Sequence, residues 1–199
     1  MGRPQFDFKQ FSIYQEHCAM KVCTDACIFG AWVSQRIGKA RSVLDIGSGT
    51  GLLMLMLAQR SDAKMQGIEI EELCCSDLKK NIDSSPWANR ITVSCGDARE
   101  LIHPDRFDFI LSNPPFYAND LPAASERDML AKHSTHLTFE NLLQIISVNL
   151  TPSGSFAVLL PFHRKDVFEQ LAIKKGFLLK ERLWISESNA HPFFRSCDW

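Results

Sequence analysis

Long apolar runs and a sizeable net charge are both missing from this chain of 199 residues. No stretch approaches the roughly 18 apolar residues of a membrane span, and Met1-Gly2-Arg3-Pro4 leads into no apolar signal core. We therefore expect a cytoplasmic protein. The formal net charge of −1 gives no overall attraction to nucleic acid, so any such contact must come from local clusters.

Charge is nevertheless uneven along the chain. Residues 1–41 hold six Lys or Arg against three acids, residues 163–182 also hold six against three, and residues 97–128 hold three against seven. Two basic flanks thus frame an acidic centre, although a solvated surface also produces such fluctuations. The candidate phosphate contacts are Lys9, Lys21, Arg164 and Lys165.

A paired C-x-x-C motif is also missing, although the chain has seven cysteines. The tightest group, Cys18, Cys23 and Cys27, has spacings that match no zinc-ribbon or thioredoxin pattern. Cys74 and Cys75 are adjacent, and on a helix they would point about 100° apart rather than toward one metal. We therefore expect no metal site and seven reduced, mostly buried thiols.

Strand and helix patterns alternate along the sequence. Strands are predicted at residues 42–46, 65–70, 91–95, 107–112, 155–160 and 177–186, and helices at residues 26–35, 52–58, 71–82, 138–150 and 164–175. Such alternation predicts an α/β fold, with a mostly parallel Rossmann-like sheet covered by helices on both faces. We expect one domain over residues 1–199, with an N-terminal arm and helix in 1–40 and the core in 41–199.

Two segments depart from this pattern. Residues 113–136 contain Pro114, Pro115 and Pro122 and lack periodicity, which predicts a long loop or lid. A seven-stranded sheet of this kind closes with an antiparallel strand, yet only residues 196–199 remain after the segment 191–195. The last strand is therefore expected to be cut short.

Three glycines, Gly47, Gly49 and Gly51, follow the first predicted core strand and open a predicted helix. Their spacing differs from the dinucleotide fingerprint G-x-G-x-x-G, because position 52 is Leu. Glycines let the backbone approach a ligand without a Cβ, although the same spacing also occurs in ordinary strand-to-helix turns. Asp45, just ahead, adds an acceptor for a cationic ligand or its water.

Acidic side chains follow the next two predicted strands. Glu69 stands roughly twenty residues past the glycines, where a carboxylate can accept hydrogen bonds from both hydroxyls of a ribose. Asp97 and Ala98 follow the third core strand, where a carboxylate and a backbone amide can bind the edge of an adenine. Either acid alone is also typical of a helix cap. Together with Asp45 they favour a nucleoside cofactor.

The tetrapeptide Asn113-Pro114-Pro115-Phe116 follows the fourth core strand. Its prolines fix the backbone, so the Asn113 side-chain oxygen and the Pro114 carbonyl can accept both hydrogens of one NH₂ group. Phe116 can stack on the ring that carries this amine, a contact worth about 1–3 kcal/mol per base. A turn with an incidental aromatic residue is the structural alternative. The motif favours an enzyme that methylates a planar amine.

The glycine loop and the Asn-Pro-Pro-Phe motif resemble those of class I S-adenosylmethionine-dependent methyltransferases over residues 42–186. The segments Phe6-Asp7-Phe8-Lys9-Gln10-Phe11 and Cys18-Ala19-Met20-Lys21-Val22 are similar to the start of the bacterial tRNA1(Val) adenine-37 N6-methyltransferases. Cys23 stands where that family normally has glycine, and the family usually continues some tens of residues past position 195.

The resemblance implies S-adenosylmethionine as cofactor, S-adenosylhomocysteine as product and tRNA as substrate. The implied cofactor contacts are Asp45, Gly47, Gly49, Gly51, Glu69, Asp97 and Ala98, with Lys21 and Thr24 above the cofactor. The implied amine-holding residues are Asn113, Pro114, Pro115 and Phe116. His133 and His136 have no partner carboxylate at helical spacing, which disfavours a catalytic role and leaves phosphate contact as the alternative.

We therefore hypothesise methyl transfer to N6 of adenine 37 in the anticodon loop of tRNA1(Val). One alternative is a protein glutamine N5-methyltransferase, because a glutamine amide is also a planar NH₂. Such enzymes usually carry a helical N-terminal domain, for which about 41 residues leave no room. A second alternative is a catalytically inactive cofactor- or RNA-binding protein of the same fold. The sequence predicts neither membrane contact nor an obligate protein partner.

Overall fold

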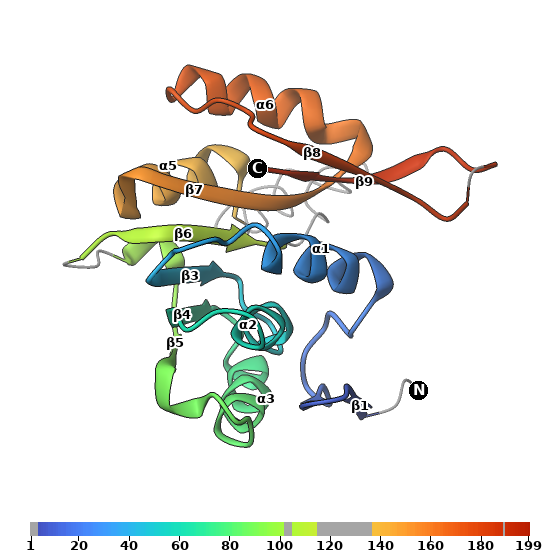
Figure 1. The fold of residues 1–199 in the computed structure, drawn as a ribbon, viewed down its shortest axis with the longest axis vertical. Coiled ribbons are helices and arrows are strands. Elements are labelled where there is room, and N and C mark those ends of the chain that lie inside the picture. Colours follow the sequence, from blue (N-terminus) through green and yellow to red (C-terminus); the bar gives the residue numbers. More distant parts are fainter. Residues whose placement is uncertain (1–3, 102–104, 115–136, 189) are drawn as a thin grey trace, which may run out of the picture.

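The computed structural model describes residues 4–101, 105–114, 137–188 and 190–199 (Figure 1). A small hairpin pairs β1 (Gln5–Asp7) with β2 (Ser12–Tyr14). The main sheet contains β3 (Ser42–Ile46), β4 (Lys64–Glu69), β5 (Ile91–Cys95), β6 (Phe107–Ser112), β7 (Leu150–Pro161), β8 (Arg182–Ser186) and β9 (Phe193–Asp198). The α-helices are α1 (Thr24–Ser34), α2 (Leu52–Ala58), α3 (Glu72–Asp83), α5 (Phe139–Asn149) and α6 (Lys165–Lys174).

The seven strands of the main sheet lie in the order β5-β4-β3-β6-β7-β9-β8. Strands β3 to β7 pair in parallel, and β9 runs antiparallel to both of its neighbours. The carboxyl ends of β3, β4, β5 and β6 therefore meet at one edge of the sheet. The strand order reverses between β3 and β6, which is where open α/β sheets form a ligand-binding crevice.

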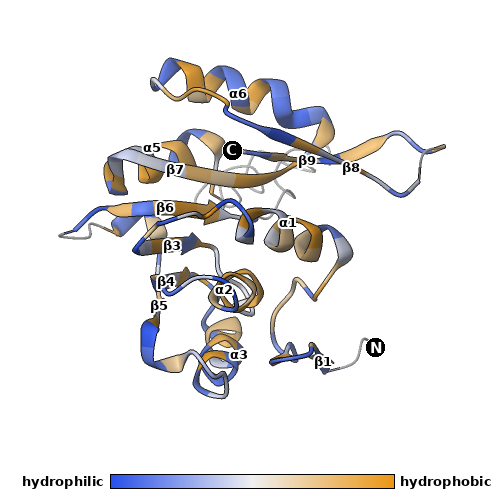
Figure 2. Cartoon of the chain, viewed as in Figure 1, coloured by the Kyte–Doolittle hydropathy of each residue, from blue (hydrophilic) through white to orange (hydrophobic). Residues whose placement is uncertain are grey.

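Two apolar clusters cover the two faces of the sheet. Helices α1, α2 and α3 pack on one face, with Phe29, Met54 and Leu78 fully buried, while α5 and α6 pack on the other through residues such as Ile146 and Phe168. Figure 2 shows α2 as almost wholly hydrophobic, whereas α6 alternates hydrophilic and hydrophobic stretches. Helix α2 is thus an internal element, and α6 presents one face to solvent.

The predicted α/β sheet is confirmed, but the expectation of a shortened last strand is wrong. Strand β9 is six residues long and pairs with β7 on one side and β8 on the other. Arg195 lies opposite Pro161 within the ladder, so the strand begins before residue 196. Strand β8 begins at Arg182 rather than at residue 177, and β9 covers the apolar edge of β7 by pairing with it.

Three 3₁₀ turns complete the elements of the described residues. The 3₁₀ turns are Ala88–Arg90, Ala98–Glu100 and Phe162–Arg164. Phe8 and Phe11, in the turn between β1 and β2, stack with ring centroids 4.6 Å apart. This contact holds the hairpin of the N-terminal arm together. Within the described residues, no helix combines the length and the apolar character that crossing a membrane would require.

Candidate cofactor and acceptor site

A cavity of about 550 Å³ opens at the carboxyl edge of the sheet, where β3, β4, β5 and β6 end. Seven of the residues predicted from sequence line it together with Lys21: Gly47, Gly49, Glu69, Asp97, Ala98, Asn113 and Pro114. Asp45, Gly51 and Thr24 do not line it, and Pro115, Phe116, His133 and His136 fall outside the described residues. The tertiary structure thus gathers residues spread over more than 90 positions into one hollow.

The glycine loop joins β3 to α2 through three left-handed residues, at φ 71° for Gly47, 53° for Gly49 and 82° for Gly51. A Cβ on Gly47 or Gly49 would meet nothing within 4 Å, whereas one on Gly51 would lie 2.9 Å from Leu78. The first two glycines therefore bend an open backbone past the cavity. The third lets the loop pack against α3.

Glu69 connects the glycine loop to the start of α3. One carboxylate oxygen accepts the Gly49 amide at 2.7 Å, and the other accepts the Glu71 amide at 2.9 Å. Each oxygen keeps a second lone pair, so the carboxylate can still accept hydroxyl donors from a ligand. Because Glu69 is 8% exposed and lines the cavity, it shapes the loop and offers an acceptor to the same space.

Asp45 is fully buried at the end of β3, with the glycine loop directly after it. Among the described residues, neither of its carboxylate oxygens has a hydrogen-bond partner. Burial, followed by the negative charge of Glu69, raises the pKa of this carboxyl to about 8. An unpaired buried carboxyl is costly, so this group favours a proton or a cation beside it.

Asp97 lines the cavity just after the end of β5, but its carboxylate is already paired with a neighbouring side chain. The Arg99 guanidinium donates to both carboxylate oxygens at 2.5–2.9 Å, and the Arg99 amide donates at 2.8 Å. These hydrogen bonds hold the pKa of Asp97 below its usual value. Sequence reasoning identified the acid but missed the arginine, which also lines the cavity.

Asn113 and Pro114 follow the end of β6 and line the same cavity as the glycine loop. Asn113 is partly exposed, and its amide nitrogen contacts the Met20 sulfur at 3.4 Å. Among the described residues, its amide oxygen accepts no hydrogen bond, so that oxygen is available to an amine. Ser112, just before, is buried and donates to the Ile46 carbonyl at 2.8 Å, which ties the end of β6 to the end of β3.

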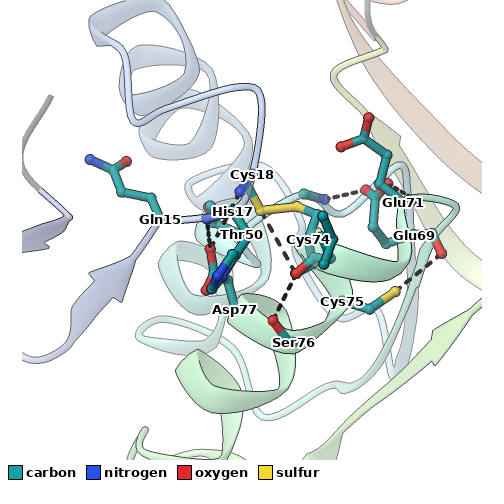
Figure 3. The surroundings of a disulfide bond; sticks show 12 residues. Gln15, His17, Cys18, Thr50, Glu69, Glu71, Cys74, Cys75, Ser76 and Asp77 are labelled. Carbon is teal, nitrogen blue, oxygen red and sulfur yellow. Dashed lines mark hydrogen bonds and ion pairs between the residues drawn. A yellow bond between two sulfur atoms is a disulfide. The ribbon is translucent and has the colours of Figure 1, made fainter. Parts of the chain in front are cut away.

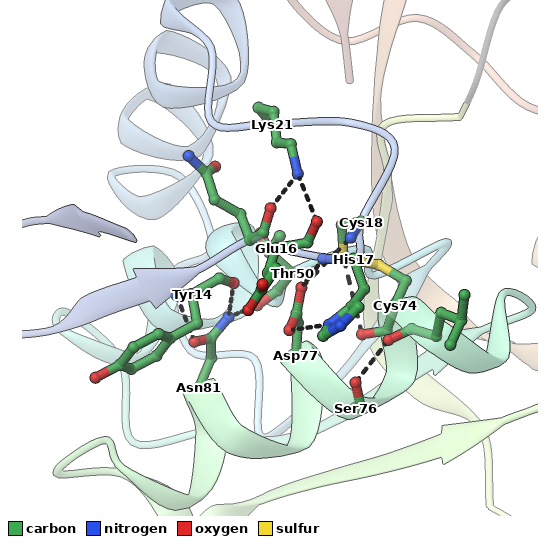
Figure 4. A network of polar contacts seen from close by, with 12 residues as sticks. Tyr14, Glu16, His17, Cys18, Lys21, Thr50, Cys74, Ser76, Asp77 and Asn81 are labelled. Carbon is green, nitrogen blue, oxygen red and sulfur yellow. Dashed lines mark hydrogen bonds and ion pairs between the residues drawn. A yellow bond between two sulfur atoms is a disulfide. The ribbon is translucent and has the colours of Figure 1, made fainter. Parts of the chain in front are cut away.

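Residues 15–22 form a roof over the cavity, and α3 holds it in place (Figure 4). Asn81 accepts from the Tyr14 amide at 2.7 Å and donates to the carbonyls of Tyr14 and Thr50 at 2.8 and 2.9 Å. It thereby links the N-terminal arm to the glycine loop. The Lys21 ammonium donates to the carbonyls of Gln15 and Glu16, so it braces the roof.

Asp77 anchors the same roof one turn earlier on α3. Its carboxylate accepts the His17 amide at 2.7 Å and the Cys18 amide at 3.4 Å, and it contacts the His17 ring at 3.0 Å. Burial raises the pKa of Asp77, but these hydrogen bonds outweigh it, and the pKa lies below its usual value. The carboxylate is thus charged in the folded state.

A disulfide bond joins the roof to α3 as well (Figure 3). Cys18 bonds Cys74 with 4.4 Å between their Cα atoms. Cys75 also bonds Cys95, at the end of β5, with 6.0 Å between their Cα atoms. The expectation of seven reduced thiols is therefore wrong for these four residues. Local spacing carried no sign of the pairs, because the partners are 56 and 20 positions apart.

The remaining three cysteines are free thiols. Burial raises the pKa of Cys23 to about 11 and that of Cys197 to about 12, so both stay protonated near neutral pH. Within the described residues, His, Cys, Asp and Glu side chains form no group of three placed to hold a metal ion.

Comparison with known proteins identifies the family to which the chain belongs. Residues 28–174 match the methyltransferase small domain family. The chain is 37% identical over 196 residues to the tRNA1(Val) (adenine(37)-N6)-methyltransferase of Bacteroides fragilis, covering 96% of this chain and 82% of the relative. It is 38% identical over 194 residues to the Escherichia coli protein of the same name, covering 96% and 78%.

The chain belongs to the methyltransferase small domain family. It is a class I S-adenosylmethionine-dependent methyltransferase by sequence, as the resemblance of its motifs predicted. Solved structures agree on the fold: Pyrococcus horikoshii TYW2, determined in complex with MeSAdo, superposes with a TM-score of 0.67 at 14% identity, covering 98% of this chain and 69% of that one.

Several lining residues of this methyltransferase escaped the sequence analysis. Ile70, which directly follows Glu69, is 53% exposed at the cavity. Leu53, Leu137, Met20 and Val22 add further apolar surface. The one sequence signal for Ile70 was an apolar residue directly after the strand-end acid Glu69. The other lining residues have the sequence pattern of ordinary core or loop residues, and only the tertiary structure brings them to the cavity.

Proposed function

We propose that this methyltransferase transfers the methyl group of S-adenosylmethionine to N6 of an adenine in tRNA, at position 37 of the anticodon loop of tRNA1(Val). The observation that carries the proposal is the position of Asn113 and Pro114 on the rim of the cavity that the glycine loop and Glu69 line. Relatives at 37–42% identity are tRNA1(Val) (adenine(37)-N6)-methyltransferases, which supports the substrate.

The cavity of about 550 Å³ has the size of a small-molecule site, and we infer that it binds a nucleoside carrying a cationic side arm. Glu69 would accept the ribose hydroxyls, and Asp97 with the Ala98 amide would bind the adenine edge once Arg99 moves aside or stacks on the ring. The apolar Ile70 would cover the other face of the base. The open backbone of Gly47 and Gly49 would allow close approach of the side arm, and the unpaired Asp45 carboxyl lies where a positive charge is favoured.

Bound in this way, S-adenosylmethionine supplies an electrophilic methyl group. The protein's part is to hold the acceptor still, because the lone pair of an adenine amine is shared with the ring. The Asn113 oxygen and the Pro114 carbonyl would accept its two hydrogens and favour a tetrahedral nitrogen that can attack. Such preorganised contacts are typically worth 10²–10³ in rate. The proton would leave to water after transfer.

An anticodon-loop base suits a protein without a separate recognition domain, since such a base is already unpaired. Presenting it costs less than extracting a base from a duplex. Phosphate contacts fall to the basic flanks, among which Lys9 is exposed, whereas Lys21 braces the roof and Lys165 pairs with Asp166 at 2.8 Å. RNA affinity should therefore weaken as salt rises.

The test is methyl transfer from radiolabelled S-adenosylmethionine to unmodified total tRNA, with nucleoside analysis of the product. We expect N6-methyladenosine in tRNA, and a 10²- to 10³-fold lower kcat for Asn113→Ala with unchanged cofactor affinity. Label in protein glutamine rather than RNA would favour the glutamine methyltransferase. Cofactor binding by calorimetry without any transfer would favour an inactive binding protein.

A further inference from the structure

Three aromatic rings form an exposed cluster outside the cavity. Phe162 follows β7, Trp184 lies on β8 and Phe193 begins β9, and their ring centroids are 5.2–5.7 Å apart in all three pairs. Trp184 is 38% exposed and Phe193 is 46% exposed. We call these three residues the aromatic platform. Apolar surface gathered in this way usually marks a contact site.

Cationic side chains are interleaved with these rings. The Lys165 ammonium lies 4.6 Å from the Phe162 centroid and 5.9 Å from that of Trp184, and the Arg182 guanidinium lies 5.2 Å from Trp184. Asp198 at 2.6 Å and Glu169 at 3.0 Å hold Arg182 in place. The tryptophan thus lies beside a fixed cation and remains 38% exposed to solvent.

The platform projects beyond the sheet edge that carries the candidate acceptor site. Val158 of β7 is level with Ser112, the residue before Asn113. Pro161, three residues further along β7, lies opposite Arg195, and the pair Ser186 and Phe193 lies further out still. In Figure 1 the β8–β9 hairpin accordingly extends past the carboxyl ends of the central strands.

We propose that the aromatic platform stacks an unpaired nucleotide next to the methylated one and so forms part of the RNA-binding surface. This inference rests on the proposed function. RNA is favoured as the occupant because flat rings with interleaved cations match bases and phosphates, and because His163, Arg164 and Lys165 follow Phe162 directly. The platform also continues the edge at which the target adenine would be held.

The test compares variants that keep a ring with variants that keep only apolar volume. Trp184→Phe, Trp184→Leu and Phe193→Leu are titrated with a fluorescein-labelled, unmodified anticodon stem-loop, and their kcat and KM are measured with the same RNA. We expect Trp184→Leu and Phe193→Leu to weaken RNA binding about tenfold and to raise KM similarly. Trp184→Phe should stay near wild type, and kcat and cofactor affinity should not change.

Val148→Ala is the matched control, because Val148 is 41% exposed near the end of α5, at the opposite edge of the sheet from the platform, and this variant should bind RNA like wild type. Melting temperatures close to wild type show that the variants fold. Equal affinity of Trp184→Leu and wild type would overturn the platform, as would a loss in Val148→Ala of the same size. A variant that shifts a dimer to a monomer in sedimentation, with RNA affinity intact, would assign the face to a second copy of the chain.

The two proposals fail in distinguishable ways. Methylated RNA together with unaffected platform variants overturns the platform alone. RNA binding that depends on Trp184, but without methylated adenine in the product, overturns the proposed function alone. Absence of any RNA binding by the wild-type protein overturns both.

Discussion

The two halves of the carboxyl edge of the sheet differ in shape: one is a hollow and the other is an open surface. At β3, β4 and β5 the edge is hollowed into a cavity, in which Glu69 is 8% exposed while Ile70 on the rim is 53% exposed, and Asp77, Asn81 and a disulfide bond fix its roof. At β7, β9 and β8 the edge carries rings such as Phe193, which is 46% exposed. Asn113 lies between the two halves.

This contrast follows the size of the ligands that each half would bind. A small cofactor that is the same in every reaction cycle can be surrounded, and burial strengthens each hydrogen bond to it. A polymer cannot enter a cavity, so its contacts must lie on an open surface. The half with the cavity, at β3, β4 and β5, should therefore control stability and cofactor affinity. The half with the aromatic platform, at β7, β9 and β8, should control RNA affinity.

The largest effect is expected from the Cys18–Cys74 bond, which closes a loop of 56 positions. Removing such a cross-link costs up to about 4 kcal/mol of unfolding free energy, because the unfolded chain regains freedom. Adding dithiothreitol should lower the melting temperature of the wild type by more than that of the Cys18→Ser, Cys74→Ser double variant, which keeps only the Cys75–Cys95 bond. An equal response in both would show that the bond does not stabilise the roof.

A second effect comes from the buried Asp45. Its pKa of about 8 lies above the ordinary 3.8, so between these values the folded state holds a proton that the unfolded state lacks. The unfolding free energy should therefore fall as pH rises through this window, by roughly 1.4 kcal/mol per pH unit. Denaturant titrations at pH 5, 6 and 7 should show this slope in the wild type and a shallower one in Asp45→Asn.

Asp77 gives the opposite sign and serves as the control for Asp45. Its pKa lies below the ordinary 3.8, so its contribution is present above that value and is lost as pH falls through the folded pKa. Asp77→Asn should thus remove stability near neutral pH and leave the slope between pH 5 and 7 unchanged. A shallower slope in Asp77→Asn would contradict the assignment of the slope to Asp45.

Asn81→Ala is expected to cost about 2 kcal/mol, because it removes three hydrogen bonds, two to Tyr14 of the arm and one buried bond to Thr50 of the glycine loop. Chemical denaturation measures the loss, and calorimetry should show weaker cofactor binding. Anisotropy titration should show RNA affinity close to wild type. A matching loss of RNA affinity would contradict the separation of the two halves.

The smallest effect concerns the pair of Asp97 and Arg99. Asp97→Asn should weaken S-adenosylmethionine binding about tenfold, because one charged acceptor is lost. Arg99→Ala frees that carboxylate and should leave affinity unchanged or improve it slightly, with calorimetry as the measurement for both. If Arg99→Ala binds as poorly as Asp97→Asn, the arginine itself contacts the cofactor.

Sequence reasoning worked best where one local pattern determines one element. The run Ser42–Ile46 followed by spaced glycines gave both β3 and its turn, because strand propensity and positive φ are local properties. It failed at β9, because the last strand was expected to be cut short after the segment 191–195, whereas the strand begins at Phe193. Pairing with both β7 and β8 decides that strand.

The candidate site divides in the same way. The chain order of Asp45, Glu69, Asp97 and Asn113 was enough to bring them to one edge, because parallel strands align their carboxyl ends. No local sequence pattern indicated that Arg99 pairs with Asp97, that Lys21 donates to a carbonyl of its own segment, or that Cys18 forms a disulfide with Cys74.

By itself the sequence determined the order of strands and helices, the glycine turn and the identity of the acids and amides at the strand ends. These depend on neighbouring residues and on the handedness of the connections. Only the tertiary structure decided which groups pair across the cavity, how the roof is fastened and where Trp184 meets Phe162 and Phe193. Such contacts join residues far apart in the chain, and packing of the whole sheet and its helices sets them.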